Sequence, residues 1–581
     1  MLSRVIRAGA LPNPPGIFLN GNLLAVGDSA SPIVLTAASA ITKGKRRSYT
    51  LSGAISGAYP LTLAPSAGTT IVLTGANTWS GGTTVSRGTV QVGNGGASGA
   101  IAGAVLNNSK YVVNLSTAYS TASYGGALTG SGAASFLSGS NLTINANAVQ
   151  GAMSFAASGQ ITINSNTLTA STLTLSSTGR MNTSTGTATL AGAVTMTSGG
   201  GFYLPANLAV GALGTVSVIN IGGGFALGNG TYGLASQSSA VGISTLGTVT
   251  INVTYTGAGA GGGAVGFGGA LTNTGGSLTI NADATGSNAR TGWDGGVNNV
   301  YAAPIQVAGT INIVATAPAT ATNGDAAFAG VVSTANATVT VTGTRKGIQL
   351  VGGASETAGT LNLSMINTSS SAAISTTAYA SNFALSGTLL LKSAGTLDIT
   401  QGVGQIYAAG GLTIDNAGAA DTISSNIVNK SVSLPTSLTK KGVGTLKLTS
   451  GSSTYSGPTS IIAGTLAVQG ASASSAHTVS GGAAISAGAV TSGSVGALTF
   501  AAASAALTVN AITSASASKL SCGALTASSG FTVNVLGAMS AGTYPVLVST
   551  SGTAIPTLGT NTSGRSVTFA WSGQTLNMTL S

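Results

Sequence analysis

The sequence GTLKLTSGSSTYSGPTSIIAGTLAV, at residues 444–468, contains the pattern that decides the fold. It begins and ends with Gly-Thr followed by apolar residues at alternate positions, in GTLKL at 444–448 and GTLAV at 464–468. An alternation with a period of two is typical of a β-strand that buries one face. Glycine suits a turn that needs positive φ, and β-branched threonine favours the extended backbone that follows. Each Gly-Thr therefore predicts a corner followed by a strand.

The same short pattern recurs along much of the chain. Several neighbouring copies start 20 to about 30 residues apart, and this distance is the length of one coil of a β-solenoid. Related strands without Gly-Thr occur at 141–145, 160–164, 277–281 and 411–415. We therefore expect an all-β, parallel β-helix or β-solenoid-like repeat, with the apolar half of each alternation pointing inward. The expected inward set includes Val90, Val92, Leu446, Leu448, Leu466 and Val468. The Gly-Thr copies begin at Gly88, Gly214, Gly247, Gly309, Gly359, Gly387, Gly395, Gly444 and Gly464.

A longer internal match strengthens this prediction. Residues 68–92 align without a gap to residues 444–468 and share ten identities, with Trp79 opposite Tyr455 and Thr83 opposite Thr459. Because an aromatic residue occupies the same place in both copies, we expect it to have a structural role at a coil corner.

The second copy, with the preceding Lys440-Lys441-Gly442-Val443, resembles the autotransporter-associated β-strand repeat of passenger domains in bacterial autotransporter adhesins. The resemblance implies a right-handed parallel β-helix that is exported and often adhesive. Two features differ from that family, because we identify neither an export signal nor a membrane-barrel domain after Ser581. These differences leave the secretion route open.

The composition excludes several functional classes. Only 5% of the 581 residues are charged, against roughly 25% in a typical soluble protein. One Cys (Cys522) and one His (His477) rule out an internal disulfide framework and a zinc site of the usual His/Cys kind. We expect no metal and no cofactor. Apolar residues are dispersed among Ser, Thr, Asn and Gly, so we expect no transmembrane segment.

Positive charge concentrates at the N-terminus, where six basic residues against Asp28 give residues 1–47 a charge of +5 out of +11. The run Lys43, Lys45, Arg46 and Arg47 is a candidate anchor for an acidic protein face, with a solvated loop as the alternative. Nucleic acid is disfavoured because no aromatic residues are interleaved. We divide the chain into an N-terminal anchoring segment (1–50), a β-solenoid region (51–495) and a C-terminal β-rich cap (496–581).

Candidate catalytic residues are few. Glycan hydrolysis needs two carboxylates, and Asp398 with Asp415 is the best pair, because their separation is close to one coil and both are expected on one solvent face; Asp421 is nearby. The alternative is that these are exposed residues that keep the solenoid soluble. His477 lacks a nucleophile motif, and Cys522 is expected to be buried. Trp293, outside any repeat, is a candidate contact for a glycan or partner.

We therefore expect a non-enzymatic surface fibre or spike. The first hypothesis is a bacteriophage tail or head fibre on the virion surface; the alternatives are an exported bacterial adhesin or surface-layer protein, at the cell surface or outside the cell, and a glycan depolymerase on a β-helix. The expected partners are structural proteins of that virion or cell surface, a host surface glycan, and further copies of the chain, without nucleic acid.

Overall fold

The computed structural model of the chain is all-β, and its described residues contain no α-helix. The described residues are 6–7, 17–19, 23–25, 28–42, 47–121, 126–223, 225–227, 230–236, 241–255, 262–266, 270–284, 297–299, 305–317, 325–328, 330–345, 347–350, 353–371, 373–376, 381–399, 403–418, 421–472 and 474–581.

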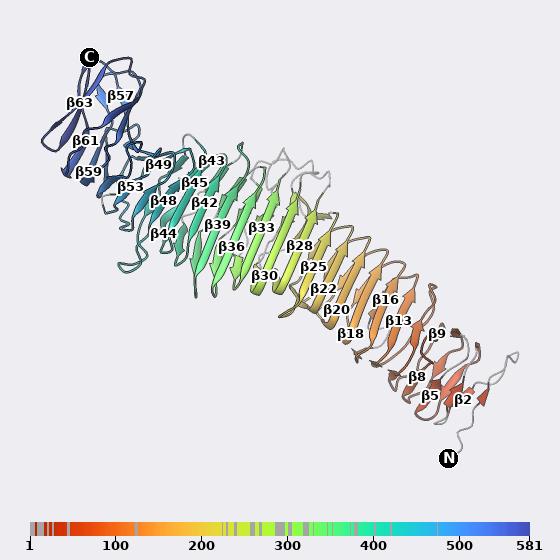
Figure 1. Cartoon of the computed structure of the whole chain (residues 1–581). Helices are drawn as coiled ribbons and strands as arrows, with labels where there is room; N and C mark the ends of the chain where they lie inside the picture. The colour runs from red at the N-terminus through yellow and green to blue at the C-terminus, as the bar shows by residue number, and fades with distance from the viewer. Residues whose placement is uncertain are drawn as a thin grey trace. The chain divides into compact units, whose positions relative to one another are not determined.

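The chain divides into two compact units, each a parallel β-solenoid (Figure 1). Unit 1 comprises Met1–Ala260 and Ala264–Asn281; unit 2 comprises Gly261–Gly263 and Ala282–Ser581. The described residues make about 19 turns in all. The predicted β-solenoid class is confirmed.

In unit 1, successive coils add strands to three columns, and neighbours within a column pair in parallel. Five long strands extend through the first and second columns: β18 (Ala148–Ala157), β20 (Thr167–Ser177), β22 (Ala188–Ser198), β28 (Ile243–Thr254) and β30 (Leu271–Asp283), the last of which continues into unit 2. The first column also holds β5 (Ser39–Thr42), β8 (Leu61–Ala64), β10 (Thr83–Val85), β12 (Val105–Asn107), β15 (Leu128–Thr129) and β24 (Leu208–Val210). The second holds β6 (Ser48–Leu51), β9 (Thr70–Leu73), β11 (Thr89–Val92), β13 (Lys110–Leu115), β16 (Ala133–Ser138) and β25 (Val216–Ile221). The third holds β14 (Tyr119–Ser120), β17 (Leu142–Ile144), β19 (Ile161–Ile163), β21 (Met181–Thr183), β23 (Phe202–Leu204) and β27 (Gly230–Ser236).

Unit 2 repeats the three-column arrangement. Its first column holds β32 (Ile305–Val307), β35 (Val331–Ser333), β38 (Ala354–Glu356), β41 (Ser381–Leu385), β44 (Val403–Ala408) and β47 (Asn426–Ile427). The second holds β33 (Thr310–Thr316), β36 (Ala337–Gly343), β39 (Leu361–Asn367), β42 (Leu389–Ser393), β45 (Leu412–Asn416), β48 (Leu438–Lys441), β50 (Thr459–Ile461), β53 (His477–Val479) and β56 (Leu498–Phe500). The third holds β31 (Val297–Asn299), β34 (Ala326–Phe328), β37 (Gly347–Leu350), β40 (Ala373–Thr376), β43 (Thr396–Ile399), β46 (Asp421–Ile423), β49 (Thr445–Leu448), β51 (Thr465–Val468), β54 (Ala484–Ser486), β57 (Ala506–Thr513), β60 (Thr532–Leu536) and β62 (Thr557–Asn561).

The two long sequence copies occupy different corners of their units. In unit 1 the Gly-Thr strands β9 and β11 stack in the second column. In unit 2 the equivalent strands β49 and β51 stack in the third column. The repeat therefore encodes a local corner and the strand after it, and this local structure fits more than one side of a coil.

The coil length varies along the chain. Residues directly opposite in neighbouring coils are separated by as few as 16 positions, for Ile17 and Ile33, and by as many as 35, for Leu208 and Ile243. Surface loops absorb such insertions at low cost, because loop-closure entropy grows slowly with loop length.

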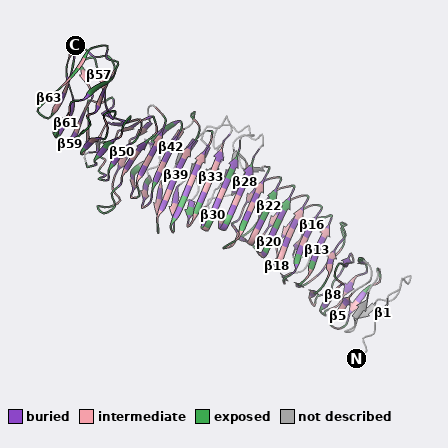
Figure 2. Ribbon diagram, in the orientation of Figure 1, coloured by how far each residue is buried: buried purple, intermediate pink, exposed green. Residues whose placement is uncertain are grey.

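The inward half of the strand alternation forms the core (Figure 2). All six residues of the predicted inward set are buried, with exposed fractions between 0% and 5%, so that prediction is confirmed. Each such side chain contributes about 1.5–3 kcal/mol to folding relative to an exposed one.

Glycine serves the Gly-Thr corners in two ways. At Gly88 and Gly464 the backbone has φ of 60° and 67°, in the left-handed region predicted for these turns. Gly444 is not in that region, but a Cβ there would lie 2.3 Å from the carbonyl oxygen of Gly418 in the preceding coil. Close packing between coils, as well as turn geometry, therefore requires glycine at these corners.

An antiparallel hairpin ends the C-terminal segment. β61 (Gly542–Ser551) pairs in parallel with β59 (Lys519–Thr526), and antiparallel to β64 (Thr575–Leu580), which pairs with β63 (Val567–Ser572). Leu576, Met578 and Leu580 of β64 are buried. The described segments include no helix of the length and apolarity required to cross a bilayer.

Candidate functional site

The two aligned aromatic residues form equivalent buried corners. Trp79 and Tyr455 are both 0% exposed. The Nε1–H of Trp79 donates to Oγ1 of Thr83 at 3.1 Å, and the hydroxyl of Tyr455 lies 2.8 Å from Oγ1 of Thr459. Each aromatic ring thus fills a corner of the core and bonds to the aligned threonine four residues later. These contacts support the structural role expected for both residues.

Lys440 is an inward-pointing charge that the sequence analysis missed as a structural residue. Its side chain is 0% exposed, and its Nζ donates to the carbonyl oxygens of Lys441, Gly442 and Ala463 at 2.7, 2.8 and 3.1 Å. Burial lowers the pKa of Lys440 to about 8, against the opposing influence of Asp415 and Asp421. The three donors of the ammonium group are all used, so Lys440 ties neighbouring coils together at a repeat corner.

The predicted anchoring and contact residues are only partly within the described chain. Lys43, Lys45, Arg46 and Trp293 lie outside the described residues. Arg47 is exposed immediately before β6, and its carbonyl oxygen accepts a hydrogen bond from the amide of Thr70. The docking role of the basic run stays a prediction.

The expectation that Asp398 and Asp415 stack on one face is wrong. Asp398 is on β43 in the third column, opposite Thr422, whereas Asp415 is on β45 in the second column, opposite Lys392 and Lys441. The two aspartates are 17 residues apart, but a full coil here takes 23 residues, from Leu389 to Leu412. The chain therefore falls short of a complete turn, and the carboxylates lie on different faces.

The carboxylate of Asp421 is also buried and hydrogen-bonded within the solenoid. It is 1% exposed; its Oδ1 accepts the amide of Leu397 at 2.8 Å, and its Oδ2 accepts Nδ2 of Asn416 at 2.5 Å. Asp415 forms an ion pair with Lys392 at 3.3 Å. These three aspartates do not assemble an acid/base pair.

Glu356 and Lys430, which are 74 positions apart in the sequence, form a second, more buried ion pair. Nζ of Lys430 is 2.7 Å from Oε2 of Glu356, and the side chains are 26% and 6% exposed. Glu356 also accepts the amides of Leu361 and Ser386 and the hydroxyl of Ser386 at 2.8, 2.7 and 2.6 Å. Burial alone would raise the pKa of Glu356, but the hydrogen bonds from Lys430, Ser386 and Leu361 outweigh it, so the pKa is lowered.

His477 is buried and uncharged at neutral pH. The side chain is 1% exposed, with Nδ1 2.8 Å from the carbonyl oxygen of Ser475 and Nε2 3.3 Å from Oγ of Ser472. Since a carbonyl oxygen can only accept, Nδ1 carries the proton. Burial lowers the pKa of His477 to about 4, although the bond to Ser475 acts in the opposite direction.

Acidification is expected to destabilise the coils around His477. The unfolded chain, with an ordinary histidine pKa near 6.5, binds the proton more readily than the folded chain. The contribution of neutral His477 to the free energy of unfolding is therefore fully present above about pH 6.5. It decreases by up to about 3 kcal/mol as the pH drops to 4. Hydrogen exchange of residues 474–500 between pH 7 and pH 4 measures this effect, and His477→Gln should flatten the dependence. An unchanged pH dependence in that variant would contradict the assignment to His477.

Cys522 is buried as expected, with 6% exposure, and burial raises the pKa of its thiol to about 11. A thiol of this kind is protonated and inert at neutral pH. Within the described part of the chain, no cluster of three or more His, Cys, Asp or Glu residues is arranged to hold a metal ion.

An open groove of about 410 Å³ runs over three consecutive coils of unit 2. It follows the corner between the first and second columns, where Thr310 of β33, Thr338 of β36 and Asn362 of β39 are in register. The groove is lined by Gly309, Thr310, Asn336, Ala337, Thr338, Thr360 and Asn362, none of which is charged.

Two asparagines in this groove are held by backbone hydrogen bonds across the coils. Oδ1 of Asn336 accepts the amide of Thr360 at 3.0 Å, and Oδ1 of Asn362 accepts both the amide and the hydroxyl of Thr388 at 3.0 Å. Because a backbone amide can only donate, the acceptor must be the side-chain oxygen. Within the described residues neither Nδ2 has a partner, so both amino groups are available as donors.

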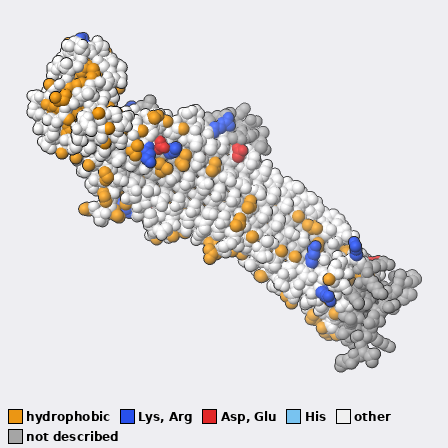
Figure 3. All heavy atoms as spheres, viewed as in Figure 1, with side chains coloured by type: hydrophobic (Ala, Val, Ile, Leu, Met, Phe, Trp, Pro, Cys, Tyr) orange, Lys and Arg blue, Asp and Glu red, His pale blue; other side chains and the backbone are white. Residues whose placement is uncertain are grey.

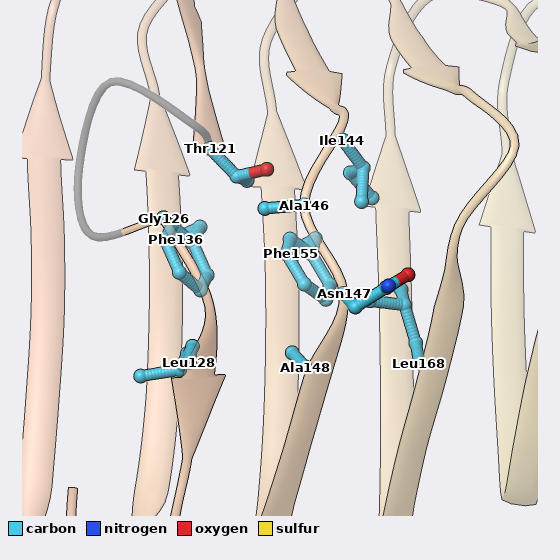
Figure 4. Close-up of a pocket in the computed structure, with 10 residues that line it drawn as sticks. All are labelled: Thr121, Gly126, Leu128, Phe136, Ile144, Ala146, Asn147, Ala148, Phe155 and Leu168. Atoms are coloured by element: carbon cyan, nitrogen blue, oxygen red, sulfur yellow. The ribbon is translucent and has the colours of Figure 1, made fainter. Parts of the chain in front are cut away.

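A small pocket lies inside unit 1, between side chains of successive coils (Figure 4). This pocket of about 10 Å³ lies beside Phe136 and Phe155, whose rings stack with centroids 5.0 Å apart. This space accommodates about one water molecule.

Comparison with protein families identifies the repeat. Residues 67–92 and 438–468 match the passenger-associated-transport-repeat. These segments include both long copies and Lys440, so the predicted resemblance to an autotransporter passenger repeat is confirmed. Neither the curated proteins nor the solved structures gave a match.

Proposed function

We propose that the chain is a non-enzymatic adhesive passenger displayed on the bacterial cell surface. The observation that carries this proposal is the passenger-associated repeat at residues 67–92 and 438–468, each copy building two stacked corners of a β-solenoid. The repeat favours the exported adhesin over the virion fibre, for which the comparisons offer no support.

The surface chemistry supports a binding role. On the face shown in Figure 3, charged side chains are few, although one group of basic and acidic side chains lies together, and most of the surface is backbone or uncharged polar groups with scattered hydrophobic side chains. Outward positions of the long strands carry hydroxyl groups, for example Thr174 on β20 and Thr195 on β22, which are exposed and in register. A surface of this kind offers many hydrogen bonds over a large area without the catalytic groups of an enzyme.

Deletion of the gene in the source bacterium tests adhesion. We expect the deletion to reduce attachment of the cells to surfaces and to other cells, and expression of the full chain to restore it. Equal attachment of deleted and parental cells would contradict the adhesive role.

The absence of hydrolase activity is part of the same proposal, because Asp398 and Asp415 lie in different columns. Incubation of the chain with capsule or lipopolysaccharide should release no oligosaccharide, as measured by chromatography of the soluble fraction. Release that Asp398→Asn or Asp415→Asn abolishes would replace the adhesin with a depolymerase.

A further inference from the structure

We propose that the groove lined by Thr310, Asn336, Thr338 and Asn362 binds a neutral polysaccharide chain. This inference rests on the proposed adhesive function and names its ligand class. The groove's volume of about 410 Å³ is within the range of roughly 300–1,000 Å³ found for small-ligand sites. It is open to solvent and extends over three successive coils, so a ligand longer than a single small molecule can reach it.

The arrangement of polar groups matches a linear, repeating ligand. Thr310, Thr338 and Asn362 occupy equivalent outward positions on three successive coils. Neighbouring parallel strands lie about 4.8 Å apart, so the groove presents a row of uncharged hydroxyl and amide groups at a regular spacing. A polysaccharide offers hydroxyl groups at regular intervals that both donate and accept hydrogen bonds.

The two asparagines are pre-organised donors. Their Oδ1 atoms are held by the amides of Thr360 and Thr388, at 3.0 Å in each case. The Nδ2 groups are therefore oriented before any ligand arrives, and binding does not require these side chains to be ordered again. A hydroxyl or ring oxygen of a sugar is a suitable acceptor for each.

The chemistry of the groove disfavours other ligands. Its lining has no charged residue, so an anionic polysaccharide gains no ion pair there. The nearby Glu356 is turned inward, with its side chain 6% exposed and paired with Lys430. An extended peptide is disfavoured because the groove follows side chains of paired strands, whereas strand addition needs an unpaired sheet edge.

The test uses the full chain on an array of neutral and acidic glycans that includes dextran and mannan, at high salt. High salt screens the non-specific attraction of a chain with a net charge of +11 to acidic glycans. We expect retention on at least one neutral glycan. Retention on acidic glycans alone, or on none, would overturn the proposal, as would retention of carboxymethylated casein in place of a glycan.

A matched pair of variants locates the site. In the double variant Asn336→Asp, Asn362→Asp, each side chain keeps an oxygen that accepts the backbone amide but loses its Nδ2 donor. The control is Asn382→Asp, because Oδ1 of Asn382 accepts the amide of Gln405 at 3.0 Å and this residue is not part of the groove lining. We expect the double variant to lose about tenfold or more in affinity and the control to bind like the parent. Unchanged binding by the double variant would overturn the site.

Attachment assays separate this inference from the proposed function. Cells carrying the double variant could attach as well as parental cells, while cells with the gene deleted attach less. In that case the adhesive function is supported, and the groove is not the binding site. If the deletion itself leaves attachment unchanged, the adhesive function fails, whatever the array shows.

Discussion

Replacing Trp79 with alanine is expected to lower the free energy of unfolding of its coils by about 3–5 kcal/mol. The indole ring is 0% exposed, so its removal leaves a cavity between stacked coils. The change also leaves the buried hydroxyl of Thr83 without its partner Nε1–H. Hydrogen exchange of residues 67–92 during urea denaturation measures the loss.

Thr83→Val is the matched control for this variant, because it removes the hydrogen bond and keeps the ring. We expect it to cost about 1–3 kcal/mol, less than Trp79→Ala, because it leaves the buried Nε1–H of Trp79 without an acceptor but creates no large cavity. If Trp79→Ala is as stable as the parent chain, the aromatic corner is not a structural element of the repeat.

The second large effect is expected from the buried ion pair. Glu356→Gln should destabilise unit 2 by about 3 kcal/mol. The substitution removes the carboxylate that neutralises Lys430 and leaves its partly buried ammonium group without a counter-charge. The pair connects coils far apart in the sequence, so protection from hydrogen exchange should fall both near residues 354–361 and near residues 426–438.

The ion pair between Asp415 and Lys392 provides the comparison. These side chains are 30% and 54% exposed, and an exposed pair contributes about 0–1 kcal/mol. Asp415→Asn should therefore change stability little. Equal effects of Glu356→Gln and Asp415→Asn would contradict the ranking by burial.

The fold was predictable because its cause is local. In strands such as GTLKL at 444–448, the apolar positions alternate and the glycine marks a corner, and both signals survive variation in coil length. The pairing of Trp79 with Tyr455 in the alignment likewise predicted equivalent corners. The alternation in LTKK at 438–441 also placed Lys440 inward, a signal that was overlooked because lysine is rarely buried without partners.

The contacts between distant coils were not predictable in the same way. Whether two residues share a face depends on the length of every loop between them, and a shortfall of six residues separated Asp398 from Asp415. No local pattern relates Glu356 to Lys430, or Asn336 to Thr360, because those contacts depend on the stacking register. The residues that form a surface site on a solenoid can therefore be identified only from the structure, whereas the core residues can be predicted from the sequence.

Surface exposure on intact cells tests the central claim most directly. Mild protease treatment of living cells of the source bacterium, followed by mass spectrometry of the released peptides, should yield peptides of this chain while cytoplasmic markers stay intact. Phage particles purified from the same cultures should contain none. Peptides of this chain in purified phage particles, together with none released from intact cells, would contradict a cell-surface passenger and restore the virion fibre.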